Sequence, residues 1–239
     1  MKTLDFLNDI SIYQHIDGYR VSVDALLLYS FVRLKRIDYL ADLGAGCGVI
    51  GLLLAKKYGK ARVLLIELQE GLARLAADNI RLNRLEERVS LIHGNIIEVS
   101  GRPEMAGAFD AVVSNPPFRQ LKTGLMSPKD ERAIARHEGT LTLSQLLRSA
   151  SLMLKHHGRL YMIHLPERLP EIVLKMRQNS IEIKVLRFVH SYAHSNAKMI
   201  LIEAVKGAKP GGVKVINPLI IYCAPNTYSQ EVLDLYKTG

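Results

Sequence analysis

The sequence predicts an α/β fold in which helices cover both faces of a mostly parallel sheet. Short apolar segments typical of buried strands recur along the chain, and stretches with apolar residues at helical spacing lie between them. Strands that alternate with helices form parallel sheets, because each crossover helix returns the chain to the same edge. Ligands of such sheets bind beyond the carboxyl ends of the strands, so we expect the functional site in the loops that follow them.

The elements are expected in the following order. Strands are predicted at 39–43, 62–67, 89–92, 108–114, 159–165, 181–190 and 198–205. Helices are predicted at 49–58, 72–83, 143–156 and 170–179, and a basic loop and a short helix fill 119–138. Residues 25–32 predict a helix, so we expect a helical extension over 1–37. A terminal β segment is expected at 213–222, with Asn217 and Pro218 interrupting it as on a sheet edge.

Length and composition limit the class of protein. A chain of 239 residues is long enough for one α/β domain, so we expect a single domain over 1–239 with its core at 38–239. The net charge of +9 fits a polyanionic partner such as nucleic acid, and it also fits many other proteins. Two cysteines without CxxC spacing, and no apolar run that could serve as a leader or a membrane span, predict a cytoplasmic protein without a metal site.

A glycine-rich turn, DLGAGCGVIG, follows the first predicted strand of the core. Gly44, Gly46 and Gly48 let the backbone approach a ligand, and the next helix presents unpaired N–H groups that suit an anionic group. Because Gly46, Gly48 and Gly51 also satisfy the dinucleotide pattern GxGxxG, the anion can be a pyrophosphate or an amino-acid carboxylate. Asp42 favours the second, since an acid here can pair with the amino group of a methionine moiety.

An acidic residue, Glu67, ends the second core strand, and Leu68 follows it. A carboxylate at this position can accept hydrogen bonds from both hydroxyls of a ribose. It therefore indicates a nucleoside and fits a nicotinamide dinucleotide and S-adenosylmethionine equally well.

The fourth predicted strand of the core ends in Asn115-Pro116-Pro117-Phe118. The prolines fix the backbone and remove two N–H donors, which leaves carbonyl groups and one amide side chain to meet a ligand. An exocyclic aryl amine is a poor nucleophile, and a catalyst gains by accepting hydrogen bonds from its two protons. Asn115 and Pro116 offer the oxygens for this, while Phe118 can stack on a flipped-out base.

Together these motifs resemble class I methyltransferases that act on amines, and more particularly the bacterial tRNA adenine-N6 methyltransferases, typified by enzymes acting on valine tRNA. Further segments of the resemblance lie at 18–28, 136–138 and 205–211. The resemblance implies a Rossmann-like fold with a seven-stranded sheet whose last strand is antiparallel. It implies S-adenosyl-L-methionine as cofactor. The implied cofactor-binding residues are Asp42, Gly44, Ala45, Gly46, Gly48, Glu67, Leu68, Asn95, Ile96 and Asn115, and the implied catalytic residues are Asn115, Pro116, Pro117 and Phe118.

In one place the sequence departs from the family. The usual acid after the third strand is Asn95, whose amide oxygen can still bond the adenine amine of the cofactor, so we expect altered affinity rather than loss.

RNA is the expected partner, with tRNA first among RNAs, and the protein is expected to be a monomer. Basic residues suited to RNA phosphates lie just beyond the Asn-Pro-Pro-Phe motif, at Arg119, Lys122, Lys129, Arg132 and Arg136. A solvated loop explains the same charges equally well.

Four rival functions remain. A protein glutamine amide also presents an sp2 NH2 group to the Asn-Pro-Pro frame, although a tyrosine often replaces Phe118 in such enzymes. DNA adenine is disfavoured because no separate target-recognition domain is evident. A catalytically silent RNA-binding module is disfavoured by the intact motifs. A nicotinamide-dependent oxidoreductase is disfavoured because it would need a proton donor that the sequence does not supply.

Overall fold

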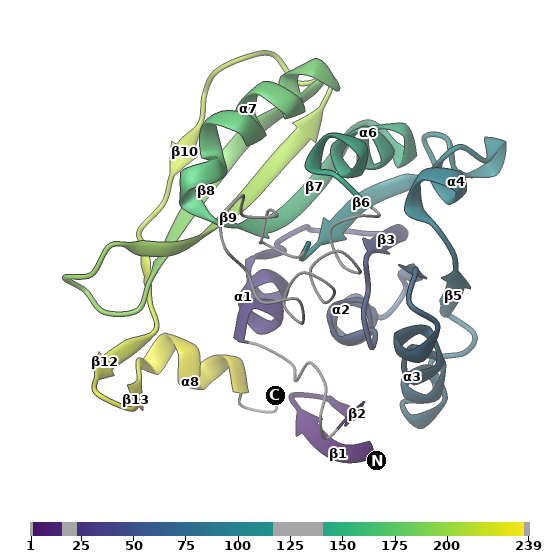
Figure 1. The fold of residues 1–239 in the computed structure, drawn as a ribbon, viewed down its shortest axis with the longest axis horizontal. Helices are drawn as coiled ribbons and strands as arrows, with labels where there is room; N and C mark the ends of the chain where they lie inside the picture. Colours follow the sequence, from purple (N-terminus) through teal and green to yellow (C-terminus); the bar gives the residue numbers. More distant parts are fainter. Residues whose placement is uncertain (1, 16–22, 117–140, 237–239) are drawn as a thin grey trace, which may run out of the picture.

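A nine-stranded sheet forms the centre of the computed structural model, which describes residues 2–15, 23–116 and 141–236 (Figure 1). Its seven long strands are β3 (Tyr39–Leu43), β4 (Arg62–Glu67), β5 (Val89–His93), β6 (Phe109–Ser114), β7 (Leu154–His164), β8 (Ile181–His190) and β9 (Ala197–Lys206). They lie in the order β8-β9-β7-β6-β3-β4-β5. All run parallel except β9, which is antiparallel to both β7 and β8. The expected mostly parallel sheet is therefore confirmed.

Two short strands bring the sheet from the expected seven strands to nine. β10 (Lys214–Val215) and β11 (Leu219–Ile220) both pair with the outer edge of β8, in parallel. Asn217 and Pro218 lie between them, because a residue without an N–H cannot continue the ladder. The interrupted edge segment predicted for 213–222 is confirmed.

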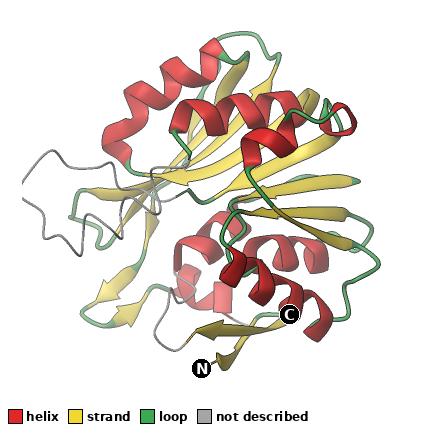
Figure 2. Ribbon diagram, turned by 45° about the vertical axis from the view of Figure 1, so that its right-hand side comes forward, coloured by secondary structure: helices red, strands yellow, loops and turns green. Residues whose placement is uncertain are grey.

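Helices cover both faces of the sheet (Figure 2). The helices are α1 (Val23–Phe31), α2 (Val49–Lys57), α3 (Glu70–Leu82), α4 (Ile96–Ser100), α6 (Leu143–Met153), α7 (Leu169–Gln178) and α8 (Gln230–Tyr236), and single 3-10 turns lie at Pro103–Met105 and Pro166–Arg168. Apolar residues of α1, α2 and α3 pack on one face, and those of α4, α6 and α7 pack on the other. Neighbouring residues of β3 divide accordingly, since Leu40 faces the first core and Ala41 the second.

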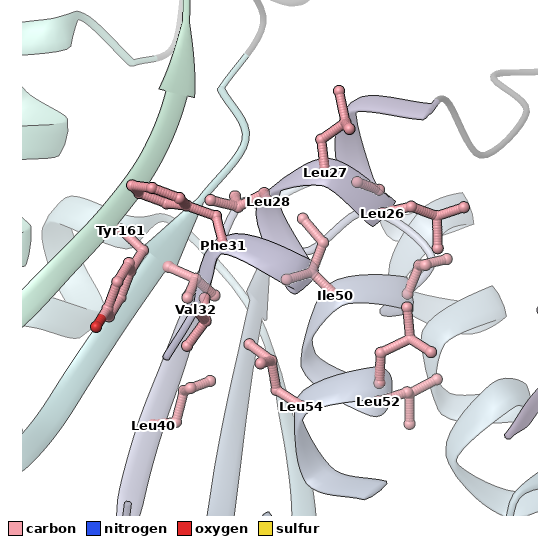
Figure 3. Packing of buried hydrophobic residues seen from close by; sticks show 14 of the residues in the cluster. Leu26, Leu27, Leu28, Phe31, Val32, Leu40, Ile50, Leu52, Leu54 and Tyr161 are labelled. Carbon is pink, nitrogen blue, oxygen red and sulfur yellow. The ribbon is translucent and has the colours of Figure 1, made fainter. Parts of the chain in front are cut away.

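The first core includes the region where α1 and α2 meet the sheet (Figure 3). Leu27 and Leu28 of α1, Leu54 of α2 and Leu40 of β3 are all completely buried in it. Burying each such leucine contributes about 1.5–3 kcal/mol relative to leaving it exposed. This packing fixes α2, and with it the glycine turn from which α2 starts.

The expected helical extension over 1–37 is only partly right. A hairpin of β1 (Lys2–Leu7) and β2 (Ile10–His15) comes before α1, so the helix accounts for Val23–Phe31 alone. Ile10 and Ile12 alternate with more exposed residues, which is the period of a strand, and both are buried against the core. Asn8 makes the two-residue turn with a positive φ of 48°.

The helix predicted for 143–156 ends three residues early, at Met153, and β7 begins at once with Leu154. Leu154 pairs with Phe109, while the next paired residue of β7 is Arg159, opposite Ala111. Residues 155–158 therefore form an irregularity in the strand, with His157 at φ 62°. Pairing with β6 overrides the helical pattern of these residues.

Three elements near the carboxyl end were not predicted. β12 (Tyr222–Ala224) and β13 (Thr227–Tyr228) form a small hairpin, and α8 follows. Arg187 of β8 holds this unit, because its guanidinium donates to the carbonyl of Asn217 at 2.9 Å and to both carboxylate oxygens of Glu231 at 2.7 and 2.9 Å.

Gly51→Ala is expected to destabilise the protein by about 1–3 kcal/mol, because overpacking forces neighbours to shift. Gly51 lies in α2, and a Cβ there would be 2.2 Å from Cδ2 of Leu65 and 3.3 Å from Oδ2 of Asp42. Urea unfolding at unchanged slope measures the loss. The control is Gly71→Ala in α3, where a Cβ meets no described heavy atom within 4 Å. Equal stability of the two variants would contradict close packing at Gly51.

Candidate cofactor and substrate site

Three candidate residues lie level with one another at the carboxyl edge of the sheet. In the register of β3 with β4, Leu43 pairs with Ile66, so Gly44 and Glu67 are the next residues of the two chains. In the register of β3 with β6, Asp42 pairs with Val113, so Asn115 lies level with Gly44 as well. Adjacent strands are about 4.8 Å apart. The glycine turn, the acid and the Asn-Pro step therefore converge.

The strand order makes this edge a switch point. From β3, the chain moves to β4 on one side and later to β6 on the other. The next described helices after β3 and β6, α2 and α6, pack on opposite faces of the sheet, and open α/β sheets bind ligands at such a switch point, beyond the carboxyl ends of the strands. The expected position of the site is thus consistent with the topology.

The glycine turn has two kinds of glycine. Gly44, Gly46 and Gly48 have positive φ angles of 74°, 59° and 89°, which other residues rarely adopt. A Cβ at Gly44 or Gly46 would meet no described heavy atom within 4 Å, so open space lies beside both. A Cβ at Gly48 would be 3.0 Å from Cδ1 of Leu65, so the close packing of the turn on β4 also requires a glycine at this position. The cofactor roles of the three glycines stay predictions.

Glu67 is 5% exposed and is built into the turn. Its Oε2 accepts the N–H of Gly46 at 2.8 Å, and its Oε1 accepts the N–H of Gln69 at 2.8 Å. A carboxylate has about four lone-pair sites, so two remain for a ligand. Glu67 thus joins the turn after β3 to the end of β4 and keeps capacity to bind hydroxyl groups.

Asp42 lies in β3, two residues before Gly44 of the glycine turn, and is 1% exposed. Its Oδ2 accepts the N–H of Gly51 at 2.9 Å, while Oδ1 has no hydrogen-bond partner among the described residues. Burial raises the pKa of Asp42 to about 7, against the lowering effect of the Gly51 bond, and the nearby charge of Glu67 adds to the rise. A cation that reaches Oδ1 would restore the ionised form.

In the cofactor-free protein, Asp42 is expected to make the free energy of unfolding fall as the pH rises from about 4 to about 7. A raised pKa means that the folded chain binds more protons than the unfolded chain in this window, so stability is lost through it and constant above it. The loss is at most about 4 kcal/mol, from 1.36 kcal/mol per pKa unit. Urea titrations at several pH values measure it.

Asp42→Asn should flatten this pH dependence, because the amide does not titrate. Glu104→Gln, an exposed change in the turn Pro103–Met105, should leave it as in the wild type. Identical pH profiles for the wild type and Asp42→Asn would contradict the raised pKa.

The residues after β5 form a helix start that the sequence did not reveal. Asn95 is the N-cap of α4, and its Oδ1 accepts the N–H of Ile97 at 2.9 Å. Asparagine caps helices as well as aspartate does, which explains why the family's acid can be replaced here. Ile96 is buried, whereas Leu68, which directly follows β4, is exposed. Contact of these three residues with a cofactor stays a prediction.

Two asparagines, Asn79 of α3 and Asn83 directly after it, contact the residues around the site, and sequence reasoning missed both. Asn79 is completely buried, donates from Nδ2 to the carbonyl of Cys47 at 2.9 Å, and exchanges bonds of 2.6 and 3.2 Å with the backbone of Tyr13. Asn83 likewise accepts the N–H of Ser11 at 3.0 Å and donates to its carbonyl at 2.7 Å. The two amides thus bond to the backbone of β2 as a neighbouring strand would, and Asn79 also connects β2 to the glycine turn. The available signal was two amides four residues apart on a helix, where one falls on the buried face.

The end of β6 is fixed to that of β3 by a buried hydroxyl. Ser114 Oγ donates to the carbonyl of Leu43 at 2.8 Å, directly before Asn115 and Pro116. Both of these residues are half-buried. Several predicted residues lie outside the described part of the chain: Pro117, Phe118, Arg119, Lys122, Lys129, Arg132 and Arg136.

Two kinds of feature are absent from the described residues. None of their helices is long and apolar enough to cross a membrane, and no three of their His, Cys, Asp and Glu side chains gather as metal ligands would. Burial raises the pKa of the Cys47 thiol to about 11, so this thiol in the turn stays protonated at neutral pH.

A parallel sheet with one antiparallel strand, a three-glycine turn after its central strand and a buried acid after the next strand are typical of the Rossmann-like fold of nucleoside-binding enzymes. Residues 19–181 match the family model of the methyltransferase small domain. The chain therefore belongs to this family of S-adenosylmethionine-dependent methyltransferases.

Relatives with a stated activity cover most of the chain. A protein of Porphyromonas gingivalis named tRNA1(Val) (adenine(37)-N6)-methyltransferase is 33% identical over 200 residues, which are 81% of this chain and 76% of the relative. A protein of the same name from Aliivibrio fischeri is 32% identical over 173 residues, 69% of each chain.

Solved structures share the fold. The crystal structure of protein Atu636 from Agrobacterium tumefaciens, described as a predicted O-methyltransferase, has a TM-score of 0.67 and 25% identity, and covers 89% of this chain and 94% of its own. TYW2 of M. jannaschii, solved with AdoMet, has a TM-score of 0.58 and covers 86% of each chain. At 15% identity, the latter shows the fold alone.

Proposed function

We propose that this protein transfers a methyl group from S-adenosylmethionine to the exocyclic N6 amine of an adenine in RNA, and that its substrate is a tRNA. The observation that carries the proposal is the register that brings Gly44, Glu67 and Asn115 level on three neighbouring strands. Relatives with this stated activity, more than 30% identical over most of the chain, support the substrate class.

The residues present fit the cofactor. Gly44 and Gly46 border open space, and Glu67 keeps lone pairs for ribose hydroxyls. Asp42 holds one orphaned buried oxygen toward a cationic group. Ala45, Gly48, Leu68, Asn95 and Ile96 complete the proposed cofactor site. S-adenosylmethionine supplies a methyl group on a positively charged sulfur, which needs no metal and no covalent enzyme intermediate.

The substrate side of the site acts through acceptors. The Oδ1 of Asn115 and the carbonyl of Pro116 accept hydrogen bonds from the two amine protons, which withdraws the nitrogen lone pair from the ring and aims it at the methyl group. Pro117 holds this backbone, and Phe118 stacks on the base. The basic residues between Arg119 and Arg136 contact RNA phosphates in this proposal.

The test is transfer of a labelled methyl group to total unmodified tRNA, followed by nuclease digestion and mass analysis of the nucleosides. The expected product is N6-methyladenosine. Bacterial protein extract is labelled in parallel, and label found only in protein would favour glutamine methylation. No label in either, despite measurable cofactor binding, would favour another substrate or a silent RNA-binding module.

A further inference from the structure

Four tyrosines, one in the turn between β8 and β9 and three in the last elements of the described chain, form a row of contacting rings, here called the ladder. The rings of Tyr192 and Tyr222 are 5.6 Å apart between centroids with 35° between planes, those of Tyr222 and Tyr228 are 5.1 Å apart at 13°, and those of Tyr228 and Tyr236 are 5.8 Å apart at 28°. Offset stacking at these distances is favourable for aromatic pairs. The ladder joins the turn between β8 and β9 to β12, β13 and α8.

The ladder lies at the same edge of the sheet as Asn115. β9 is antiparallel to both β7 and β8, so β8 runs parallel to β6 and β7 and its turn emerges where those strands end. β11 is parallel to β8, with Ile220 opposite His190, and the N–H of Tyr222 donates to the carbonyl of Ser191 at 2.9 Å. Figure 1 shows this turn next to β12 and β13.

The two ends of the ladder are exposed. Tyr192 is 41% exposed and Tyr236 is 39% exposed, while the two middle rings are half-buried. Each middle ring contacts two described rings, whereas each end ring contacts one; the contact of Tyr192 with Tyr222 is tilted and the other two are stacked. An end ring therefore offers a further face on which a flat group can continue the stack.

Charge distinguishes the two ends. Residues 188–202, which include Tyr192, contain a lysine and two histidines but no aspartate or glutamate. Exposed His194 and Lys198 lie in or next to the turn. The helix of Tyr236 carries Glu231 and Asp234 instead. A flat ligand with a phosphate backbone is thus favoured at the Tyr192 end.

We propose that Tyr192 is an RNA-binding residue on which an unpaired base of the substrate RNA stacks, outside the site that receives the adenine. This inference rests on the proposed function, and it adds a second contact surface at the carboxyl edge of the sheet. Stacking on aromatic side chains is tolerant of base identity, so this contact serves affinity and orientation rather than sequence choice. A rigid ladder behind the ring lowers the cost of ordering it.

The sequence contains no tryptophan, which permits a direct test. Tyr192→Trp introduces a single tryptophan at the end of the ladder, which can be excited selectively over the tyrosines, and a short single-stranded oligoribonucleotide is expected to quench its emission. An abasic ribose-phosphate oligomer of the same length should not. The control is Tyr39→Trp, because Tyr39 is similarly exposed, at 43%, but starts β3 at the opposite edge of the sheet. Its emission should stay unchanged.

Affinity gives the second readout. Tyr192→Ala should bind tRNA about tenfold or more weakly than the wild type, because it removes the aromatic ring. Tyr192→Phe should bind tRNA as the wild type does, because it keeps the ring. Both variants are expected to keep the fold. Affinity for S-adenosylmethionine should be the same in all three. Equal quenching at Tyr192→Trp and Tyr39→Trp, or full tRNA affinity in Tyr192→Ala, would overturn the inference. If the inference is overturned but the wild type still binds and methylates tRNA, the proposed function stands. If the wild type binds no RNA, both the inference and the proposed function fail.

Discussion

Asn115→Ala is expected to lower the rate of methyl transfer by about 10²–10³-fold, the usual effect of removing one preorganised hydrogen-bonding group from a transition state. The affinity for S-adenosylmethionine should change little, because the amide acts on the amine and the proposed cofactor contacts come mainly from residues at the ends of β3, β4 and β5. Single-turnover rates at saturating cofactor, with calorimetric cofactor binding, measure the two quantities.

The chain contains a matched control for this change. Asn217 also precedes a proline, lies exposed between β10 and β11, and contacts Arg187 through its backbone carbonyl. Asn217→Ala should therefore keep the wild-type rate. Equal losses of rate and cofactor affinity in Asn115→Ala would contradict its assignment to the amine.

Glu67→Gln is expected to have the opposite signature, with cofactor affinity weakened about 10- to 100-fold and the rate at saturation largely kept. Both carboxylate oxygens accept backbone N–H groups, so an amide turns one acceptor into a donor that faces another donor. Hydrogen bonds to charged groups contribute about 1.5–3 kcal/mol each. Calorimetric titration with S-adenosylmethionine measures the affinity.

Glu70→Gln is the control, because Glu70 is exposed in the first turn of α3 and pairs only with Arg74 among the described residues. It should bind the cofactor as the wild type does. A Glu67→Gln protein with unchanged affinity would remove Glu67 from the cofactor site.

The sequence predicts the parts of the fold that depend on local pattern. The ends of β3, β4 and β6 fall where apolar runs stop at Gly44, Glu67 and Asn115, so the candidate site could be located from the sequence. These runs are buried on both faces, and burial leaves little freedom in where such a strand ends.

The predictions that failed concern elements that are held in place by residues distant in sequence. β2 is held by Asn79 and Asn83, more than 60 residues away, and residues 10–15 contain no pattern that predicts these partners. The tyrosine ladder likewise needs the turn after β8 and the end of the chain to meet. The helix predicted to reach 156 loses its last turn to pairing with β6, because sheet pairing across the core outweighs helix propensity.

The central place of β3 has a consequence for how the protein responds to its ligand. Gly44, Glu67 and Asn115 are brought together only when β3 has paired with both β4 and β6, and the β6 pairing closes a loop of about 70 residues. No shorter fragment of the chain assembles this edge, so a ligand that binds there favours only the complete sheet. Saturating cofactor, at a hundred times its Kd, should raise the free energy of global unfolding by about 2.7 kcal/mol. Hydrogen exchange of β3, β4 and β6 should slow together, as one cooperative unit.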